Sequence, residues 1–385
     1  MCQSLYPDEA IYIPNRHVGV VGQYSPASAI AWPVHLEIRR LNSLRALAAL
    51  IVLVGHYSNR AQLWDAVLGT RAPQLGVMLF FLLSAFLMTI LYMDRHPTRD
   101  AMATYAWARA ARVLPLFVVV VLASYLLGKL PVAWLQASVY AIPDWKAVAS
   151  HLLFLFGVQV LWTIPAEIHF YAIFALLWWL RPRLPLALPL FCAVVLGIFA
   201  SGHWPLGPKQ PILGFPIDLP LLRGLPYFVA GMLLGLLYLR WRPPARWQHP
   251  AYAAAGLGLV LLLYPAILER LTGWTYVMWF NPLVLLVMAL AFFCVVFMAP
   301  AGNRLLESRI GDYLGKISYS LYLLHFPILL ALGKFGMARG ELGLLLFLGL
   351  TIAAAALSFR LVEAPARRAI RRLGTRGHGR GTAAG

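Results

Sequence analysis

Long apolar segments alternate with short polar connections along most of the chain. Ten of them approach or reach the ~17–25 residues that an α-helix needs to cross a bilayer. They lie at 42–60, 75–93, 113–130, 163–180, 184–200, 224–239, 251–268, 276–299, 317–335 and 341–361. A further apolar stretch, 147–160, is short and close to the fourth segment, so we interpret it as a re-entrant or interfacial helix. The pattern predicts an all-α integral membrane protein, a bundle of about ten transmembrane helices.

Basic residues gather in the connections that would face the cytoplasm. With the N-terminus placed inside, 23 of the 32 lysines and arginines fall in cytoplasmic connections or tails, as the positive-inside rule requires. We therefore expect both termini to be cytoplasmic. The net charge of +18 is explained by this topology and by attraction to anionic membrane lipid, so we expect no nucleic-acid partner.

Composition agrees with a membrane protein and divides the chain into three parts. The chain is 61% hydrophobic and 12% charged, whereas about 25% is usual in soluble domains. Residues 1–40 read as a polar N-terminal tail without a secretory signal, 41–363 as the transmembrane domain, and 364–385 as a basic cytoplasmic tail. The Pro- and Gly-rich loop 201–223 could cover a substrate entrance or serve only as a connector.

Two ionisable residues interrupt the first apolar segment, "LRALAALIVLVGH". Arg45 and His56 are eleven positions apart, which places them on one face of a helix and ~16 Å apart along its axis. Arg45 would then lie at the cytoplasmic headgroups and His56 deep in the membrane, where a polar side chain usually faces a cavity or the bundle interior. His56 is therefore a candidate general base; the structural alternative is a packed, hydrogen-bonded histidine.

The fourth segment carries "WTIPAEIHFY", with Glu167 at about the same membrane depth as His56 by helix rise. A carboxylate there could orient the imidazole, as the acid of a catalytic triad does, or it could be a structural partner of another donor. Tyr171 follows Glu167 at i+4 on the same face. In the ninth segment, Ser318, Tyr322 and His325 form one polar stripe, which suits either substrate lining or an interhelical hydrogen-bond network.

Arg109 and Arg112 stand three residues apart just before the third segment, in "WARAARVLP". With Arg45 they could bind phosphates, or they could simply anchor the topology. In the second segment we expect Ser84 and Ala85 to serve helix packing rather than catalysis. The three cysteines are scattered and suggest neither a disulfide framework nor a metal site. Motifs of hydrolases, ATPases and metalloenzymes are missing, and no inverted repeat is evident.

Six motifs in one order resemble the membrane acyltransferase 3 family, the bacterial O-acyltransferases. They are "LRALAALIVLVGH", "GVMLFFLLSAFL", "WARAARVLP", "WTIPAEIHFY", "LGKISYSLYLLHFPIL" and "FRLVEAPARR". Three positions depart from the family pattern: Met78 replaces a polar residue, Ala85 replaces glycine, and His169 stands where glutamine is common.

The resemblance implies a multi-pass protein of the bacterial inner (cytoplasmic) membrane that transfers an acyl group from cytoplasmic acyl-CoA to a carbohydrate hydroxyl. Acetyl-CoA is the expected donor, no metal is expected, and polysaccharide-assembly proteins are allowed as partners. It implies roles for three sets of residues. These are His56 and Glu167 in catalysis; Arg45, Arg109 and Arg112 at the donor phosphates; and Tyr171, Ser318, Tyr319, Tyr322 and His325 at the substrate.

We expect direct transfer, because no serine or cysteine has an identifiable neighbouring base. The alternative function is a transporter or flippase for a sugar- or acyl-containing substrate. A non-catalytic scaffold would leave the aligned Arg45 and His56 unexplained.

Overall fold

The computed structural model describes residues 34–69, 71–205, 215–273 and 278–376. Every secondary-structure element in these ranges is a helix, which confirms the predicted all-α membrane bundle. Each of the ten predicted apolar segments contains a helix. Most of the predicted tail 1–40 and the middle of the loop 201–223 lie outside the described residues.

Six helical segments are long and apolar enough to cross a membrane. They contain α1 (Val34–Ala61), α3 (Ala72–Tyr92), α4 (Arg99–Lys129), α7 (Thr163–Leu180), α9 (Leu221–Arg240) and α15 (Gly340–Ser358). Short helices α2 (Asp65–Leu68) and α5 (Ala133–Gln136) lie in the connections after α1 and α4. These six segments correspond to the first, second, third, fourth, sixth and tenth predicted spans.

The other four predicted segments are broken or short. Helices α10 (Ala251–Leu262) and α11 (Pro265–Thr272) are bent by 82° against each other, and α13 (Arg309–Lys316) and α14 (Ser318–Lys334) by 69°. The remaining two are α8 (Ala187–Ala200) and α12 (Pro282–Phe293), which continues into a π-helix, η4 (Cys294–Met298). Within the described ranges the structure therefore has six spans, or eight if each bent pair crosses once, rather than ten of full length. The reason is geometric, since α8 has 14 residues and reaches only ~21 Å of a ~30 Å hydrocarbon core.

The stretch 147–160 does not form a span of its own. It contains the end of α6 (Trp145–Leu152), an eight-residue helix, and the start of the 3-10 helix η1 (Gln159–Trp162). Two more 3-10 helices, η2 (Ala245–Trp247) and η3 (Met278–Phe280), lie in loops. This stretch therefore does not add an eleventh span.

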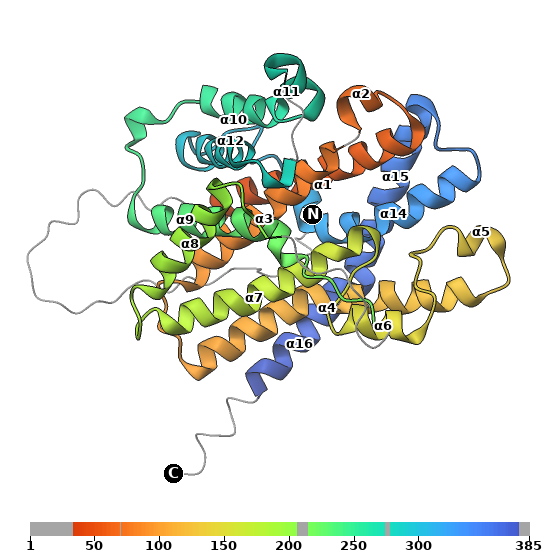
Figure 1. The fold of residues 1–385 in the computed structure, drawn as a ribbon, viewed down its shortest axis with the longest axis horizontal. Coiled ribbons are helices and arrows are strands. Elements are labelled where there is room, and N and C mark those ends of the chain that lie inside the picture. Colours follow the sequence, from red (N-terminus) through yellow and green to blue (C-terminus); the bar gives the residue numbers. More distant parts are fainter. Residues whose placement is uncertain (1–33, 70, 206–214, 274–277, 377–385) are drawn as a thin grey trace, which may run out of the picture.

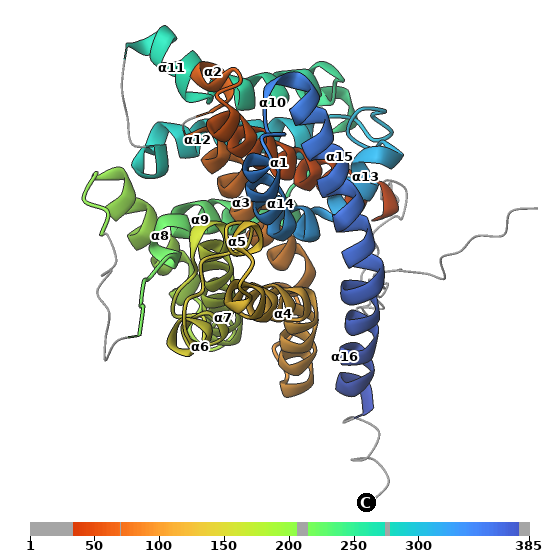
Figure 2. The same cartoon turned by 90° about the vertical axis from the view of Figure 1, so that its right-hand side faces the viewer.

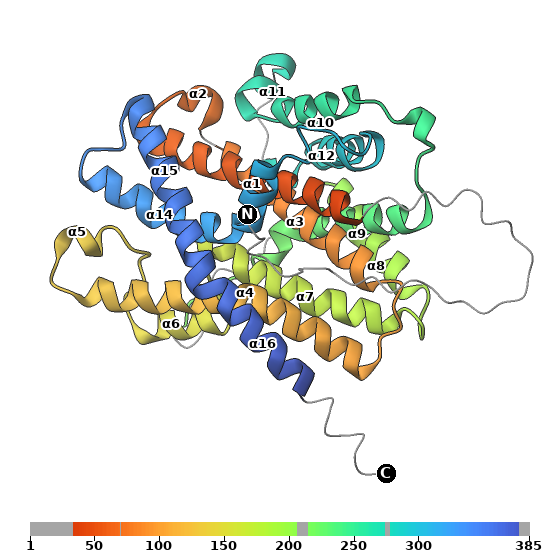
Figure 3. The same ribbon diagram turned by 180° about the vertical axis from the view of Figure 1, so that it is seen from behind.

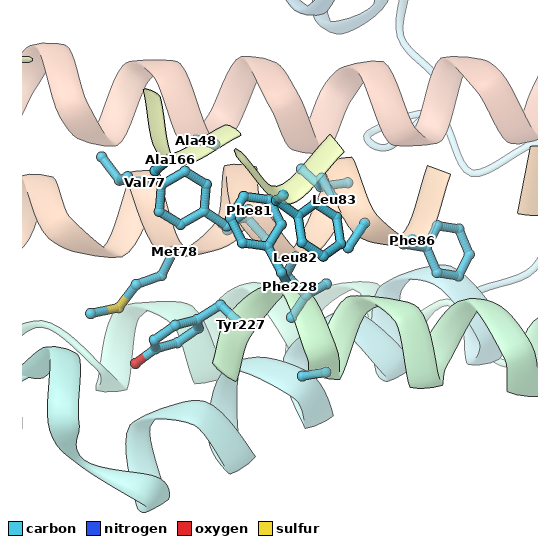
Figure 4. Close-up of a cluster of buried hydrophobic side chains, with 14 of the residues drawn as sticks. Ala48, Val77, Met78, Phe81, Leu82, Leu83, Phe86, Ala166, Tyr227 and Phe228 are labelled. Atoms are coloured by element: carbon cyan, nitrogen blue, oxygen red, sulfur yellow. The ribbon is translucent and has the colours of Figure 1, made fainter. Parts of the chain in front are cut away.

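Helix α3 is the centre of the bundle and lies between α1 and α9 (Figure 1). Small residues allow the close approach: a Cβ at Gly76 would collide with the Ala48 carbonyl of α1, and one at Gly231 would collide with the Leu82 carbonyl of α3. Figure 4 shows the apolar layer between α3 and α9, in which the rings of Phe81 and Phe228 stack 4.5 Å apart. Small residues at such contacts are typical of membrane helices, which cannot rely on a hydrophobic driving force in lipid.

The last helices form a long rod on the side of the bundle. Figure 2 shows α15, the π-helix η5 (Phe359–Glu363) and α16 (Ala364–Arg376) running on as one helix, and Figure 3 shows α16 lying across α4. At the junction, the buried carboxylate of Glu363 accepts a hydrogen bond from Ser320 on α14 and pairs with Arg367 at 2.8 Å. This contact fixes α14 against the rod and so helps to place the polar stripe of α14.

A buried ion pair fixes the start of α1. The Arg40 guanidinium lies 2.8 Å from the Glu307 carboxylate and donates hydrogen bonds to the carbonyls of Ala299 and Pro300 at 3.0 and 2.7 Å. Both side chains are less than a tenth exposed. The sequence pattern explained Arg40 only as one of the basic residues on the cytoplasmic side. In the structure, its hydrogen bonds hold α1 against the residues that follow η4.

Candidate active site

The three arginines singled out in the sequence meet in one narrow cavity of about 50 Å³. Arg45 comes from α1, and Arg109 and Arg112 come from one face of α4. Polar residues of three other helices complete the lining; they are Ser84 of α3, Thr163 and Glu167 of α7, and Ser318, Tyr319 and Tyr322 of α14. We call this the arginine cavity.

The arginine cavity has unused capacity for an anion. The Nε atoms of Arg45 and Arg109 are buried without a hydrogen-bond partner, and neither Arg45 nor Arg112 has an ion pair within the described ranges. Tyr92 and Tyr171 flank the Arg109 guanidinium, with ring centroids 6.0 and 5.7 Å away. A buried donor without a partner is costly, and guanidinium groups bind phosphate oxygens in a planar, bidentate manner. The residues present therefore fit a ligand that carries phosphate groups.

Glu167 belongs to the arginine cavity and is not paired with His56. Its carboxylate accepts hydrogen bonds from the Ser84 hydroxyl, at 2.8 Å, and from the Tyr171 hydroxyl. The expected Glu167–His56 contact is thus absent from the described structure, because equal depth on two helices does not fix the direction in which the side chains point. Ser84, expected to serve packing alone, instead lines this cavity and holds Glu167.

The partner of His56 is His325. The Nδ1 atom of His56 lies 2.9 Å from Nε2 of His325, and the two rings are stacked almost in parallel, 7° apart, with centroids 5.1 Å apart. His325 is fully buried, and its Nδ1 lies 2.6 Å from the backbone carbonyl of Tyr322. The two histidines come from α1 and α14, which are 269 residues apart in the sequence.

This chain of contacts fixes the proton positions of both neutral rings. A carbonyl oxygen can only accept, so Nδ1 of His325 must carry the hydrogen and its Nε2 must be the acceptor. Nδ1 of His56 therefore donates to His325, and Nε2 of His56 keeps a free lone pair. That is the tautomer that a general base needs.

His56 lines a second pocket of about 220 Å³, which we call the histidine pocket. Its other lining residues are Pro73, Gln74, Val77, Gln159, Val160, Trp162, Trp279, Tyr322 and Phe326. Val77 and Tyr322 also line the arginine cavity, so the two spaces adjoin across these two side chains. Sequence reasoning missed Gln74, Gln159 and Trp279, whose positions in connections or at helix ends carry no periodic signal.

The other residues that we predicted to bind the substrate do not all lie in one space. Ser318 lines the arginine cavity, and its buried hydroxyl has no hydrogen-bond partner in the described structure. Tyr319 lines the same cavity and donates to the Val113 carbonyl at 2.7 Å, while Tyr322, shared by both spaces, donates to the Val160 carbonyl at 3.0 Å. Tyr171 lines neither and is engaged with Glu167. The stripe of α14 is therefore both a hydrogen-bond network and a cavity wall.

A metal centre finds no support in the described ranges, where no three His, Cys, Asp or Glu side chains gather closely enough to hold an ion. Cys192 and Cys294 are buried free cysteines that line neither space. The described residues thus offer an imidazole with a free Nε2 lone pair in the histidine pocket and a cluster of guanidinium groups in the adjoining arginine cavity.

The sequence is similar to those of known proteins. A family model described as "Acyltransferase domain" matches residues 38–363. The chain is also 30% identical, over 282 residues, to the Exopolysaccharide production protein ExoZ of Rhizobium meliloti (strain 1021); the match covers 69% of this chain and 79% of the relative. The search of solved structures found no match.

Proposed function

Because the chain belongs to the acyltransferase 3 family of multi-pass membrane proteins, we propose that it transfers an acyl group from cytoplasmic acyl-CoA to a carbohydrate hydroxyl. Acetyl is the proposed acyl group. The name of the similar ExoZ protein supports an exopolysaccharide, or a precursor of one, as the acceptor. The bacterial inner membrane, with both termini cytoplasmic, is the proposed location.

The observation that carries the proposal is the pair of adjoining spaces. One presents three guanidinium groups, two with buried, unpaired Nε atoms, and the other presents His56 with a free Nε2. An anionic thioester donor and a hydroxyl acceptor need these two environments, and they need them in contact.

The donor enters from the arginine side. Arg45, Arg109 and Arg112 bind its phosphates, and the slender pantetheine arm follows α1 toward the histidine pocket. The rise between Arg45 and His56 on α1, ~16 Å, suits such an extended arm. Glu167 acts within this cavity, where its carboxylate holds Ser84 and Tyr171 in place, rather than as the orienting acid of His56.

The transfer is direct. Nε2 of His56 takes the proton of the acceptor hydroxyl as its oxygen attacks the thioester carbonyl. The carbon–sulfur bond then breaks, and the CoA thiolate takes that proton from His56, so that the products are an ester and free CoA. His325 is a positioning residue in this reaction. Its Nε2 accepts a hydrogen bond from Nδ1 of His56, and its own Nδ1 donates one to the Tyr322 carbonyl, which holds the His325 ring in place.

The test is transfer by the purified protein in lipid nanodiscs, supplied with acetyl-CoA and the unacetylated polysaccharide of the producing cell. Mass spectrometry detects the acetyl ester, and a thiol reagent detects released CoA. His56→Ala is expected to lose transfer by roughly 10²–10⁴-fold, the usual contribution of a general base. His169→Ala, on α7 and outside both spaces, is the matched control and should retain transfer. Full activity of His56→Ala, or substrate flux without ester formation, would contradict the proposal.

A further inference from the structure

The histidine pocket contains polar and aromatic groups that the transfer chemistry does not use. Gln74 lies near the start of α3 and Gln159 opens η1, and neither side chain has a hydrogen-bond partner among the described residues. Trp162 and Trp279 meet edge to face with centroids 5.5 Å apart, and Phe326 packs edge to face against the His56 ring at 5.7 Å. Two free amides therefore face a space walled by aromatic rings.

The backbone at Gln159 is held in an unfavourable conformation. Its φ is 49°, in the left-handed region that residues with a side chain rarely adopt. The preceding loop enforces this geometry: buried His151 donates to the Ala147 carbonyl at 2.7 Å and accepts from the Val158 amide at 3.0 Å. Backbone strain of this kind persists where the surroundings over-determine it, and it clusters at functional sites.

The chemistry of the pocket points to a ligand with many hydroxyls and no charge. Amide groups both donate and accept hydrogen bonds, as sugar hydroxyls require, and aromatic rings offer flat apolar surfaces for the C–H faces of a sugar ring. Among the described lining residues none carries a formal charge unless a histidine is protonated. The Arg223 guanidinium lies 5.4 Å from the Trp162 ring centroid and is paired with Asp218 at 3.6 Å.

We propose that the histidine pocket is the acceptor subsite and binds a neutral glycosyl residue, with Gln74 and Gln159 as its specificity-determining hydrogen-bonding residues. The aromatic walls position the sugar ring so that one hydroxyl meets Nε2 of His56. This assignment rests on the proposed function, since it names the acceptor of that reaction. It also departs from the sequence-based assignment of the acceptor to the stripe of α14, most of which lines the arginine cavity.

The experiment measures binding separately from transfer. Protein in nanodiscs is titrated by calorimetry with maltotetraose, a neutral tetrasaccharide, and with a tetrasaccharide of equal length that contains a uronic acid. Gln159→Gly removes the amide and keeps the left-handed backbone accessible, and Gln74→Ala tests the second amide. Gln136→Ala in α5, outside both spaces, is the matched control.

We expect the neutral tetrasaccharide to bind, the uronate to bind at least tenfold more weakly, and each glutamine variant to lose about five- to tenfold in affinity. Acetyl-CoA affinity of both variants should equal that of the wild type, which shows that they fold. Absence of neutral-sugar binding, equal uronate binding, or glutamine variants within twofold of wild type would each overturn the assignment. Sugar binding with no ester formed would instead count against the proposed function alone.

Discussion

Replacing His325 tests whether the imidazole pair is a working catalytic unit. In the structure, Nε2 of His325 is the sole hydrogen-bond acceptor offered to Nδ1 of His56 by the described residues. His325→Ala removes it, so neutral His56 redistributes between tautomers, and the imidazolium formed during transfer loses its orienting contact. A hydrogen bond to a charged group contributes about 1.5–3 kcal/mol, which corresponds to a roughly 10- to 150-fold fall in kcat at about 1.4 kcal/mol per factor of ten.

The assay is steady-state acetyl transfer in nanodiscs, with acetyl-CoA affinity measured in parallel to show that the variant is folded. His325→Gln is the conservative variant, because its amide oxygen can accept from His56, and it should recover part of the lost rate. Gln136→Ala in α5, outside both spaces, is the matched control.

A double-mutant cycle decides whether the two histidines act together. If His325 works through His56, the His325→Ala change should cost almost nothing in a His56→Ala background. A His325→Ala enzyme within twofold of wild type, or equal losses in both backgrounds, would refute the tautomer argument.

Three further predictions concern the donor, the stability of the bundle and the acceptor loop. Arg109→Gln should raise the KM for acetyl-CoA by roughly 10- to 150-fold, the loss of one charge-assisted contact, whereas Arg183→Gln, at an exposed position in the turn after α7, should not change it. Glu307→Gln leaves a buried guanidinium without its counter-ion and should destabilise the bundle by up to about 3–5 kcal/mol, seen as a lower Tm in detergent with an unchanged KM for acetyl-CoA; an unshifted Tm would contradict it. Burial lowers the pKa of His151 below its usual 6.5, against a smaller opposing effect of its backbone hydrogen bond. The unfolded chain therefore binds a proton at His151 more readily than the folded chain does. The contribution of neutral, buried His151 to the free energy of unfolding is thus present above about pH 6.5 and is lost as the pH falls below that value. Protonation also breaks the contact from the Val158 amide, so His151→Gln should show a smaller loss of Tm and of acceptor affinity between pH 7.5 and 5 than the wild type; an equal pH dependence would contradict the role of His151.

Apolar periodicity predicted the elements well and their continuity less well. All ten segments contain helices because backbone groups in a hydrocarbon environment must bond within the segment. The bends between α10 and α11 and between α13 and α14 come from tertiary packing, which residue counting does not contain. The meeting of the three arginines was predictable, since Arg109 and Arg112 share a helix face and all three lie toward the same ends of their helices.

The contacts between distant helices could not be read from single-helix geometry. Helix rise gives a depth for each side chain, and His56 and Glu167 indeed have similar calculated depths, yet rotation of each helix directs them to different partners. His325 was visible as part of a stripe, but its contact with His56 depends on how α14 packs against α1. Gln159 could not be predicted as a site residue, because its position depends on a loop that His151 holds in place.

The wall formed by Val77 and Tyr322 has a consequence for the energetics of export. If donor and acceptor meet there, each substrate stays on its own side of the bilayer and only a small acyl fragment changes sides. The thioester then supplies the driving force for both ester formation and vectorial delivery, without ion gradients or nucleotide hydrolysis. Such an enzyme acylates a carbohydrate on the far side of the membrane while CoA stays in the cytoplasm.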